Sequence, residues 1–183
     1  ALPSLAGLTQ LVVFYAYGNM LTGTLPALDN LTALESFYVY GNQLSGSIPA
    51  FVNVPALRQF DVSANQLTGA IPSLAGVSAL RGFRVHDNAL TGAPPAVPTP
   101  TNLLVPGGSR LCANPLSPSA NAAWDEATGS TPWSVGCGAP FTVSQTSSLD
   151  FGVVSVATPG ASQDVVLTNT SANAGSIVSC GFS

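Results

Sequence analysis

Lysine is absent from this 183-residue chain, and charged residues of all kinds make up 7% of it. Four arginines stand against eight acidic residues, which gives a formal net charge of −4. A chain with this balance offers no basic field for nucleic acid, so we expect no nucleic-acid partner. Because hydrophobic residues make up 46% of the chain, we expect a folded protein of one or two domains with a substantial core.

Long apolar runs and metal-ligand clusters are missing as well. No apolar run approaches the roughly 20 residues that a membrane-spanning helix needs, so we expect no membrane span in this chain. With one histidine and three cysteines, the chain has no cluster spaced to hold a metal, and no glycine-rich loop follows a strand to cradle a phosphate. We therefore expect neither a metal nor a cofactor.

A repeat is what the chain has in abundance. The segments "GNMLTG", "GNQLSG", "ANQLTG" and "DNALTG" place Asn19, Asn42, Asn65 and Asn88 at a constant step of 23 residues. A fixed period of this length is typical of stacked supersecondary units. Aligning the copies puts Leu, Phe, a small or branched apolar residue, Asn and Leu in fixed columns, which predicts a short strand buried on one side. The asparagine side chains are expected to bond backbone groups of the neighbouring coil.

The pattern LxxFxVxxNxLTGxIPxx resembles a leucine-rich repeat of the plant type, over residues 1 to about 116. A fifth, degenerate copy regains the frame at Leu111, Asn114 and Leu116 after three extra residues. The resemblance implies a parallel sheet on the concave side of a solenoid and a second short sheet formed by "LTGxIP". The expected fold class is thus an α/β solenoid, mostly parallel β with little helix, followed by a partial β-sandwich.

Three domains are expected: repeats at 1–111, a C-terminal cap at 112–138 and an incomplete β module at 139–183. In the cap, "SPSANAAWDEATG" predicts one short helix over the last coil, and we expect a Cys112–Cys137 disulfide, with two free thiols as the alternative. The segment "LDFGVVSVATPGASQDVVLTNTS" resembles the opening of bacterial immunoglobulin-like modules of the abnormal-spindle-like or choice-of-anchor type. That module is too short for a sandwich, so Cys180 is expected to lack its partner.

The strand columns that flank the buried Phe and Val point outward and define a candidate binding surface. We expect Tyr15 to stack beside Tyr38, and Tyr17 beside Tyr40, since neighbouring parallel strands lie about 4.8 Å apart. Tyr and Arg are enriched at interface hot spots, and aromatic rings also suit sugars; β-propensity and solubility are the plainer explanation. The candidate binding residues are Tyr15, Tyr17, Tyr38, Tyr40, Arg58, Asp61, Arg81, Arg84 and His86.

A catalytic reading of the same strands is weaker. Ser63 and His86 share a column, with Asp61 and Asp87 nearby, so a nucleophile, a base and an orienting acid can be written down. A flat sheet supplies no oxyanion hole or pocket for them. We therefore expect that the chain is not an enzyme. We also expect these four side chains to be exposed on the concave face.

The function hypothesis is a secreted or cell-surface recognition or adhesion module, bacterial by its tail, that binds a protein or glycan on the concave face. A structural subunit of an extracellular fibre is the alternative, since the opening "LPSLAGLTQL" begins mid-repeat and open ends favour self-association. Hydrolase inhibition and ice binding are further alternatives that the resemblance allows. Ice binding would need a regular array of threonines, and Thr22, Thr68 and Thr91 share one column, which Ser45 interrupts.

Overall fold

The computed structural model describes residues 1–98, 108–117, 121–131 and 133–134. The chain divides into two compact units, Ala1–Thr142 and Val143–Ser183, and every described residue belongs to the first. The immunoglobulin-like module expected at 139–183 lies outside the described residues, as do Cys137 and Cys180.

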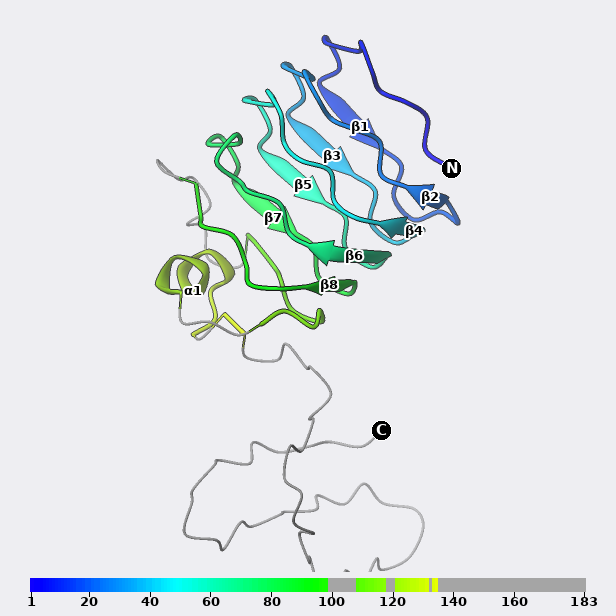
Figure 1. Cartoon of the computed structure of the whole chain (residues 1–183). Helices are drawn as coiled ribbons and strands as arrows, with labels where there is room; N and C mark the ends of the chain where they lie inside the picture. The colour runs from blue at the N-terminus through cyan, green and yellow to red at the C-terminus, as the bar shows by residue number, and fades with distance from the viewer. Residues whose placement is uncertain (99–107, 118–120, 132, 135–183) are drawn as a thin grey trace, which may run out of the picture. The chain divides into compact units, whose positions relative to one another are not determined.

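Four short parallel strands form the first sheet, in the order β1–β3–β5–β7 (Figure 1). Consecutive strands pair with a shift of one repeat, so that Phe14 lies opposite Phe37 and Phe60 opposite Phe83. This is the sheet that the repeat pattern predicts for the concave side. Its strands are β1 (Val13–Tyr15), β3 (Ser36–Tyr38), β5 (Gln59–Asp61) and β7 (Gly82–Arg84).

The "LTGxIP" segments form a second parallel sheet, in the order β2–β4–β6–β8, as the resemblance implies. Each contains a glycine with positive φ, for example Gly46 at 79°, a conformation that a side chain would strain. In the candidate ice-binding column, Thr22, Thr68 and Thr91 are exposed, and Ser45 is half-buried. The strands are β2 (Thr22–Thr24), β4 (Gln43–Gly46), β6 (Gln66–Ala70) and β8 (Ala89–Thr91).

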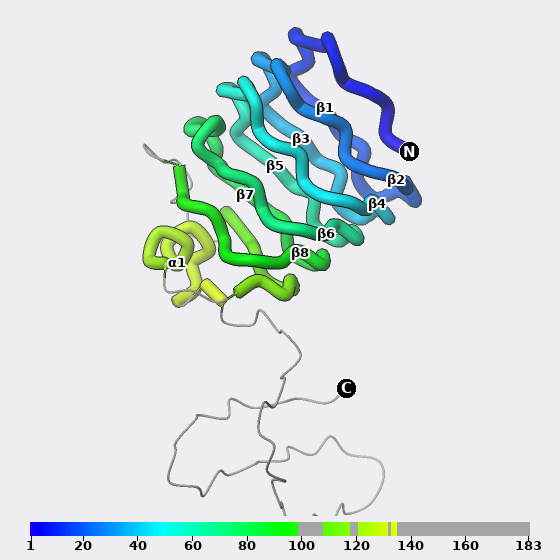
Figure 2. Tube along the Cα trace, viewed as in Figure 1, coloured from blue at the N-terminus to red at the C-terminus, as the bar shows by residue number. Residues whose placement is uncertain are grey.

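The core is a stack of identical layers, one layer per coil, which Figure 2 shows as coil upon coil along the Cα trace. The phenylalanine rings stack nearly parallel, with centroids 5.6 Å apart both for Phe37 and Phe60 and for Phe60 and Phe83. Each coil therefore buries its apolar columns against its neighbours rather than within itself. The fully buried leucines of these columns include Leu34, Leu44, Leu57, Leu67, Leu80 and Leu90.

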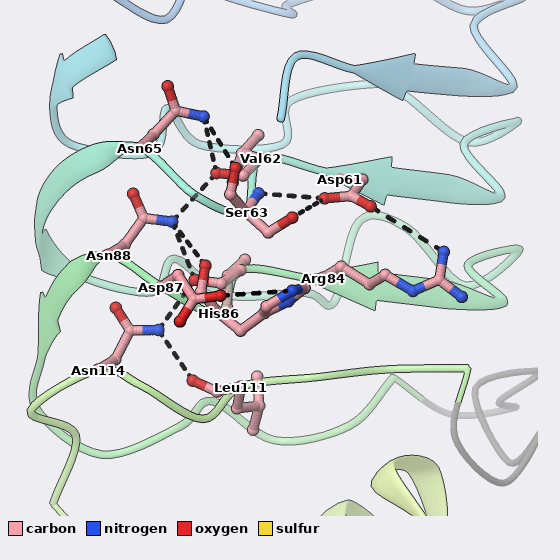
Figure 3. A network of polar contacts seen from close by, with 11 residues as sticks. Asp61, Val62, Ser63, Asn65, Arg84, His86, Asp87, Asn88, Leu111 and Asn114 are labelled. Carbon is pink, nitrogen blue, oxygen red and sulfur yellow. Dashed lines mark hydrogen bonds and ion pairs between the residues drawn. The ribbon is translucent and has the colours of Figure 1, made fainter. Parts of the chain in front are cut away.

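From the second coil onward, an asparagine ties each coil to the preceding one, as Figure 3 shows for Asn65, Asn88 and Asn114. The Asn65 Nδ2 amide donates to the carbonyl oxygens of Val62 in its own coil and Val39 in the preceding one, each at 3.1 Å. Its Oδ1 accepts from the backbone N–H of Leu44 at 3.0 Å. The expected asparagine bonding is thereby confirmed.

The degenerate fifth copy continues the ladder. Asn114 repeats the pattern, since its Oδ1 accepts from the Leu90 N–H and its Nδ2 donates to the carbonyls of Val85 and Leu111. Backbone bridges also join Arg84 to Arg110 in parallel. The sequence frame for the fifth copy is therefore correct.

Helix α1 (Ala122–Thr128) closes this end of the repeats, where the sequence predicts one short helix. The Asn121 side chain caps its first turn, and Gly129 ends it in the left-handed conformation at φ 69°. The buried Trp124 packs against Phe83, and its Nε1 donates to the Pro95 carbonyl at 2.7 Å. An indole thus covers the last phenylalanine of the stack.

Candidate functional site

Two rows of outward side chains cross the first sheet, perpendicular to its strands. The inner row follows the strand register through Tyr15, Tyr38, Asp61, Arg84 and Arg110. The outer row stands two residues later in each coil and consists of Tyr17, Tyr40, Ser63, His86 and Cys112. Both rows begin with two tyrosines and then change to smaller or charged side chains.

The tyrosines stack within each row, as the sequence predicts. Ring centroids lie 4.9 Å apart for Tyr15 and Tyr38 and 4.7 Å apart for Tyr17 and Tyr40, with planes within 12° of parallel. Between the rows the rings are tilted, by 63° for Tyr38 and Tyr40. One face of every ring is therefore covered by its partner, which leaves the edges, the hydroxyls and the outer faces for a ligand.

A shallow depression of about 300 Å³ lies between the two rows. It brings together six of the nine candidate binding residues. Burial is the largest cause that raises the pKa of Tyr38 above its ordinary value of 10.0, followed by the neighbouring Tyr15, so this phenol stays neutral at physiological pH. The lining residues are Tyr15, Tyr17, Tyr38, Tyr40, Asp61 and Arg84.

The expectation that Asp61 and Ser63 are exposed is wrong, since 8% of Asp61 and 5% of Ser63 is accessible. The Ser63 hydroxyl and backbone N–H both donate to Asp61 Oδ1, at 2.6 and 3.1 Å. The physical reason is size, because these short side chains sit in rows beside tyrosines and an arginine that rise above them. Asp61 and Ser63 therefore form the buried floor of this face and offer little surface for contact with a ligand.

Arg84 reaches from the next strand toward this floor. Its Nη1 lies 4.0 Å from Asp61 Oδ2, with 37% of the Arg84 side chain and 11% of the Asp61 side chain exposed (Figure 3). The buried carboxylate, held by Ser63, thus directs the guanidinium to one end of the depression. A half-exposed cation therefore borders the tyrosines.

Arg110 belongs to the same row but is absent from the sequence-based candidates. It is the register partner of Arg84, and it is exposed. Three extra residues displace it from the repeat period. The signal that locates it is the frame of Asn114, because Arg110 stands four residues before that asparagine, just as Arg84 stands four before Asn88.

The other two arginines lie where the strands begin. Arg58 Nη2 lies 3.9 Å from Glu35 Oε1, an exposed pair that contributes little to stability. Arg81 occupies the same position one coil later and is exposed, without an ion pair among the described residues. These two candidates therefore flank the depression without lining it.

The serine–histidine–aspartate arrangement is not assembled. Ser63 donates its hydroxyl to Asp61, whereas His86 Nε2 lies 3.8 Å from Asp87 Oδ2. Burial lowers the pKa of His86 below its ordinary value of 6.5, and the nearby Arg110 lowers it further. The His86 Nδ1 atom is buried and has no hydrogen-bond partner within the part of the chain that the structure describes. The Ser63 hydroxyl is therefore paired with the Asp61 carboxylate and not with the His86 imidazole.

A second hollow, of about 600 Å³, lies among the segments 2–9 and 24–30, away from the two rows. Asp29 is the one charged side chain that lines it. Small and apolar residues such as Pro3, Ala6 and Ala27 form most of its wall. Its polar lining residues, Ser4, Thr9, Thr24, Asp29 and Asn30, include neither an aromatic ring nor an arginine, so the depression remains the candidate site.

Within the described part of the chain, no group of three or more His, Cys, Asp or Glu side chains is placed to hold a metal ion. The helix in those same residues is too short to cross a membrane.

Two crystal structures share this arrangement of coils. That of a TDR receptor has a TM-score of 0.53 at 23% identity, covering 66% of this chain and 21% of the other. That of PEPR1-AtPEP1 has a TM-score of 0.54 at 26% identity, covering 65% and 17%. The fold is a leucine-rich-repeat solenoid.

The leucine-rich-repeat solenoid described for this chain spans about a fifth of the length of those solved chains. A third crystal structure, the Arabidopsis receptor kinase HAESA with the peptide hormone IDA and the co-receptor SERK1, has a TM-score of 0.49 at 25% identity, with 60% and 18% covered. No protein-family model matches the chain, and neither does any curated protein. The TDR receptor and PEPR1-AtPEP1 structures establish the fold of the repeats.

Proposed function

We propose that this chain is a non-enzymatic recognition module that binds a protein partner. The binding surface is the face of the first sheet that carries the two tyrosine rows, called here the first-sheet face. The observation that carries the proposal is the depression between the tyrosine rows, lined by all four tyrosines of the chain together with Asp61 and Arg84. Tyrosine and arginine dominate interface hot spots because they combine large contact areas with hydrogen-bonding ends. The similarity to the PEPR1-AtPEP1 complex supports a protein partner.

A glycan ligand is less well supported by the ring geometry. Sugar rings stack on aromatic faces, but the tyrosine pairs cover one face of each ring themselves. A polypeptide, by contrast, can use ring edges and hydroxyls together with Arg84. We therefore place protein binding first and keep adhesion to a glycan as the alternative.

A secreted or cell-surface location and a bacterial source are part of the same proposal. They rest on the likeness of "LDFGVVSVATPGASQDVVLTNTS" to bacterial immunoglobulin-like modules. Such modules are common in cell-surface proteins.

Selection of random 12-residue peptides displayed on phage, with the purified chain as bait, tests the binding proposal. Peptides that bind the wild type should fail to bind the Tyr15→Ala, Tyr38→Ala, Arg84→Ala triple variant. The matched control is Thr22→Ala, Thr68→Ala, Thr91→Ala, which changes exposed residues of the second sheet and should leave binding intact. The thermal midpoint of the control variant should stay close to wild type, since exposed sites cost under about 0.5 kcal/mol each. Tyr38 and Arg84 are half-buried, so circular dichroism should show that the first-sheet variant keeps its fold at the temperature of the binding assay.

Enriched peptides that bind the wild type and the first-sheet variant equally would overturn the proposal. So would a selection that enriches nothing while a glycan array, probed with the same purified chain, shows binding that the first-sheet variant loses. The second result would replace a protein partner with a glycan.

A further inference from the structure

We infer that the first-sheet face recognises a polypeptide segment in which a ring-bearing side chain and an acidic side chain stand three or four residues apart. The ring side chain docks between the tyrosine rows, and the acid contacts Arg84 and Arg110. This inference deepens the proposed function and rests on it.

The ring end of this surface follows from the geometry of the tyrosines. The rows are tilted by 58° at Tyr15 and Tyr17 and by 63° at Tyr38 and Tyr40, so they form the two walls of a trough. Tyr15 on β1 remains 54% accessible, and Tyr17, which follows that strand, remains 45% accessible. Aromatic-lined troughs accept proline and aromatic rings because such rings bury area at little cost in conformational entropy.

The acidic end follows from the arginines. Arg84 and Arg110 are register partners on neighbouring coils, so two like charges stand side by side on one face, an arrangement that is unfavourable without an anion. Arg110 has no ion pair among the described residues. A carboxylate placed between the two guanidinium groups would relieve their repulsion and bond to both.

Charge counting on this face favours an acidic ligand over a basic one. The carboxylate of Asp61 is buried, and its Oδ1 already accepts two hydrogen bonds from Ser63. Its Oδ2 faces Arg84 at 4.0 Å. A ligand cation would find this acid engaged, whereas a ligand acid finds Arg110, which has no ion pair in the described segments.

Asp61 also acts as a positioning residue for Arg84. Because Ser63 locks its carboxylate, the guanidinium is directed toward the tyrosine end of the depression rather than sampling the solvent. Among the described residues, Arg110 has no acidic partner comparable to Asp61, so its side chain has more conformational freedom than that of Arg84.

The spacing follows from the strand geometry. Neighbouring strands lie about 4.8 Å apart, so the distance from Tyr38 to Arg84, two strands away, is about 10 Å, and to Arg110 about 14 Å. An extended peptide advances about 3.3 Å per residue, so a chain that crosses the strands covers these distances in three to four residues. Along the inner row, a bound peptide would therefore place its ring side chain over the tyrosines, two or three residues over Asp61, and its acidic side chain at the arginines.

The peptides selected on the wild-type chain provide the test. We expect their consensus to carry Pro, Phe, Tyr or Trp, with Asp or Glu three or four positions away. A synthetic consensus peptide should bind at least tenfold more weakly to Arg110→Gln than to wild type, and the peptide with its acid replaced by Lys should regain affinity on Arg110→Glu. Glu126→Gln changes one charge on α1, outside the lining of the depression, and should change affinity less than threefold.

Asp61→Asn tests the positioning role, because it keeps the shape of the side chain and removes the charge that directs Arg84. We expect weaker binding of the consensus peptide with a nearly unchanged thermal midpoint, and a smaller further loss when Arg84→Gln is added than Arg84→Gln causes alone. Additive losses in this double-mutant cycle would overturn the coupling between Asp61 and Arg84.

Failure of the inference can be told apart from failure of the proposed function. Selected peptides that require Tyr38 and Arg84 but carry basic or uncharged residues at the expected positions would overturn the ligand chemistry and leave protein binding intact. Selected peptides that ignore both residues would overturn protein binding on this face, and the inference with it.

Discussion

The Trp124 indole packs against the ring of Phe83, with 6.1 Å between ring centroids and 45° between ring planes. In the next coil, the position that aligns with Phe83 is Ser109, which is fully buried. The Ser109 hydroxyl accepts from the Phe83 N–H at 3.2 Å, and the Ser109 N–H donates to the Ala127 carbonyl of α1 at 3.2 Å. A small polar residue thus ends the phenylalanine stack and makes room for the helix that covers it.

Trp124→Ala should destabilise the repeats strongly. The indole is fully buried, and its removal opens a cavity beside Phe83 and leaves the Pro95 carbonyl without its hydrogen bond, so we expect a loss of about 3 to 5 kcal/mol in the free energy of unfolding. Urea denaturation measures this loss. Met20→Ala is the control, since 83% of Met20 is exposed, and it should change stability by less than about 0.5 kcal/mol. Similar effects of the two substitutions would contradict the capping role.

Asn65→Asp should cost more stability than Asn19→Asp. The Asn65 amide donates to three carbonyl oxygens, including one in the preceding coil, and a carboxylate would face them without protons to share. We expect a loss of about 2 to 4 kcal/mol at neutral pH, because buried polar groups become unpaired. Asn19 bonds to two carbonyls of its own coil and is exposed, so its substitution is the matched control. If denaturation curves give the same loss of unfolding free energy for both variants, the hydrogen bond between coils does not contribute to stability.

Protonation of His86 should destabilise the fold as the pH falls. Burial and Arg110 lower its pKa in the folded state below 6.5, while Asp87 and Asp61 act in the opposite direction and Arg84 adds to the lowering. Since the unfolded chain binds the proton more tightly, this contribution to stability is present above about pH 6.5 and is lost as the pH falls below it. His86→Gln should therefore show a smaller drop in unfolding free energy between pH 7.5 and pH 5.5. Parallel pH profiles for the two proteins would exclude this role for His86.

Cys112 should be bonded to Cys137, and Cys180 to neither. Cys112 is disulfide-bonded in this structure, its sulfur lies 3.2 Å from the Trp133 carbonyl oxygen, and the other two cysteines lie outside the described residues, so the pairing remains a prediction. Non-reducing peptide mapping identifies the partner. A bond between Cys112 and Cys180 would instead join the cap to the segment that we assign to a separate module.

Much of the fold could be predicted from the sequence because each coil repeats the same local interactions. Phenylalanines that recur at a constant step are all buried only if the coils stack in register. In that register, the asparagine four residues after each inner-row position faces the preceding coil. The stacking of Tyr17 on Tyr40 follows from the same register. The segment "SPSANAAWDEATG" also predicts the short helix that contains Trp124, and the structure has it as α1.

The structure of the site depends on contacts between side chains of neighbouring coils. An alignment of the repeats shows which positions are equivalent but does not show these contacts. Exposure of an outward side chain is set by the sizes of its neighbours one coil away, which is why Asp61 and Ser63 form a buried floor between larger residues. Arg110 entered the same row because backbone pairing with Arg84 continues after three extra residues break the sequence period. The repeat alone determined which side chains face outward; packing between unlike neighbours decided which of them a ligand can reach, because accessible surface is a property of several coils together.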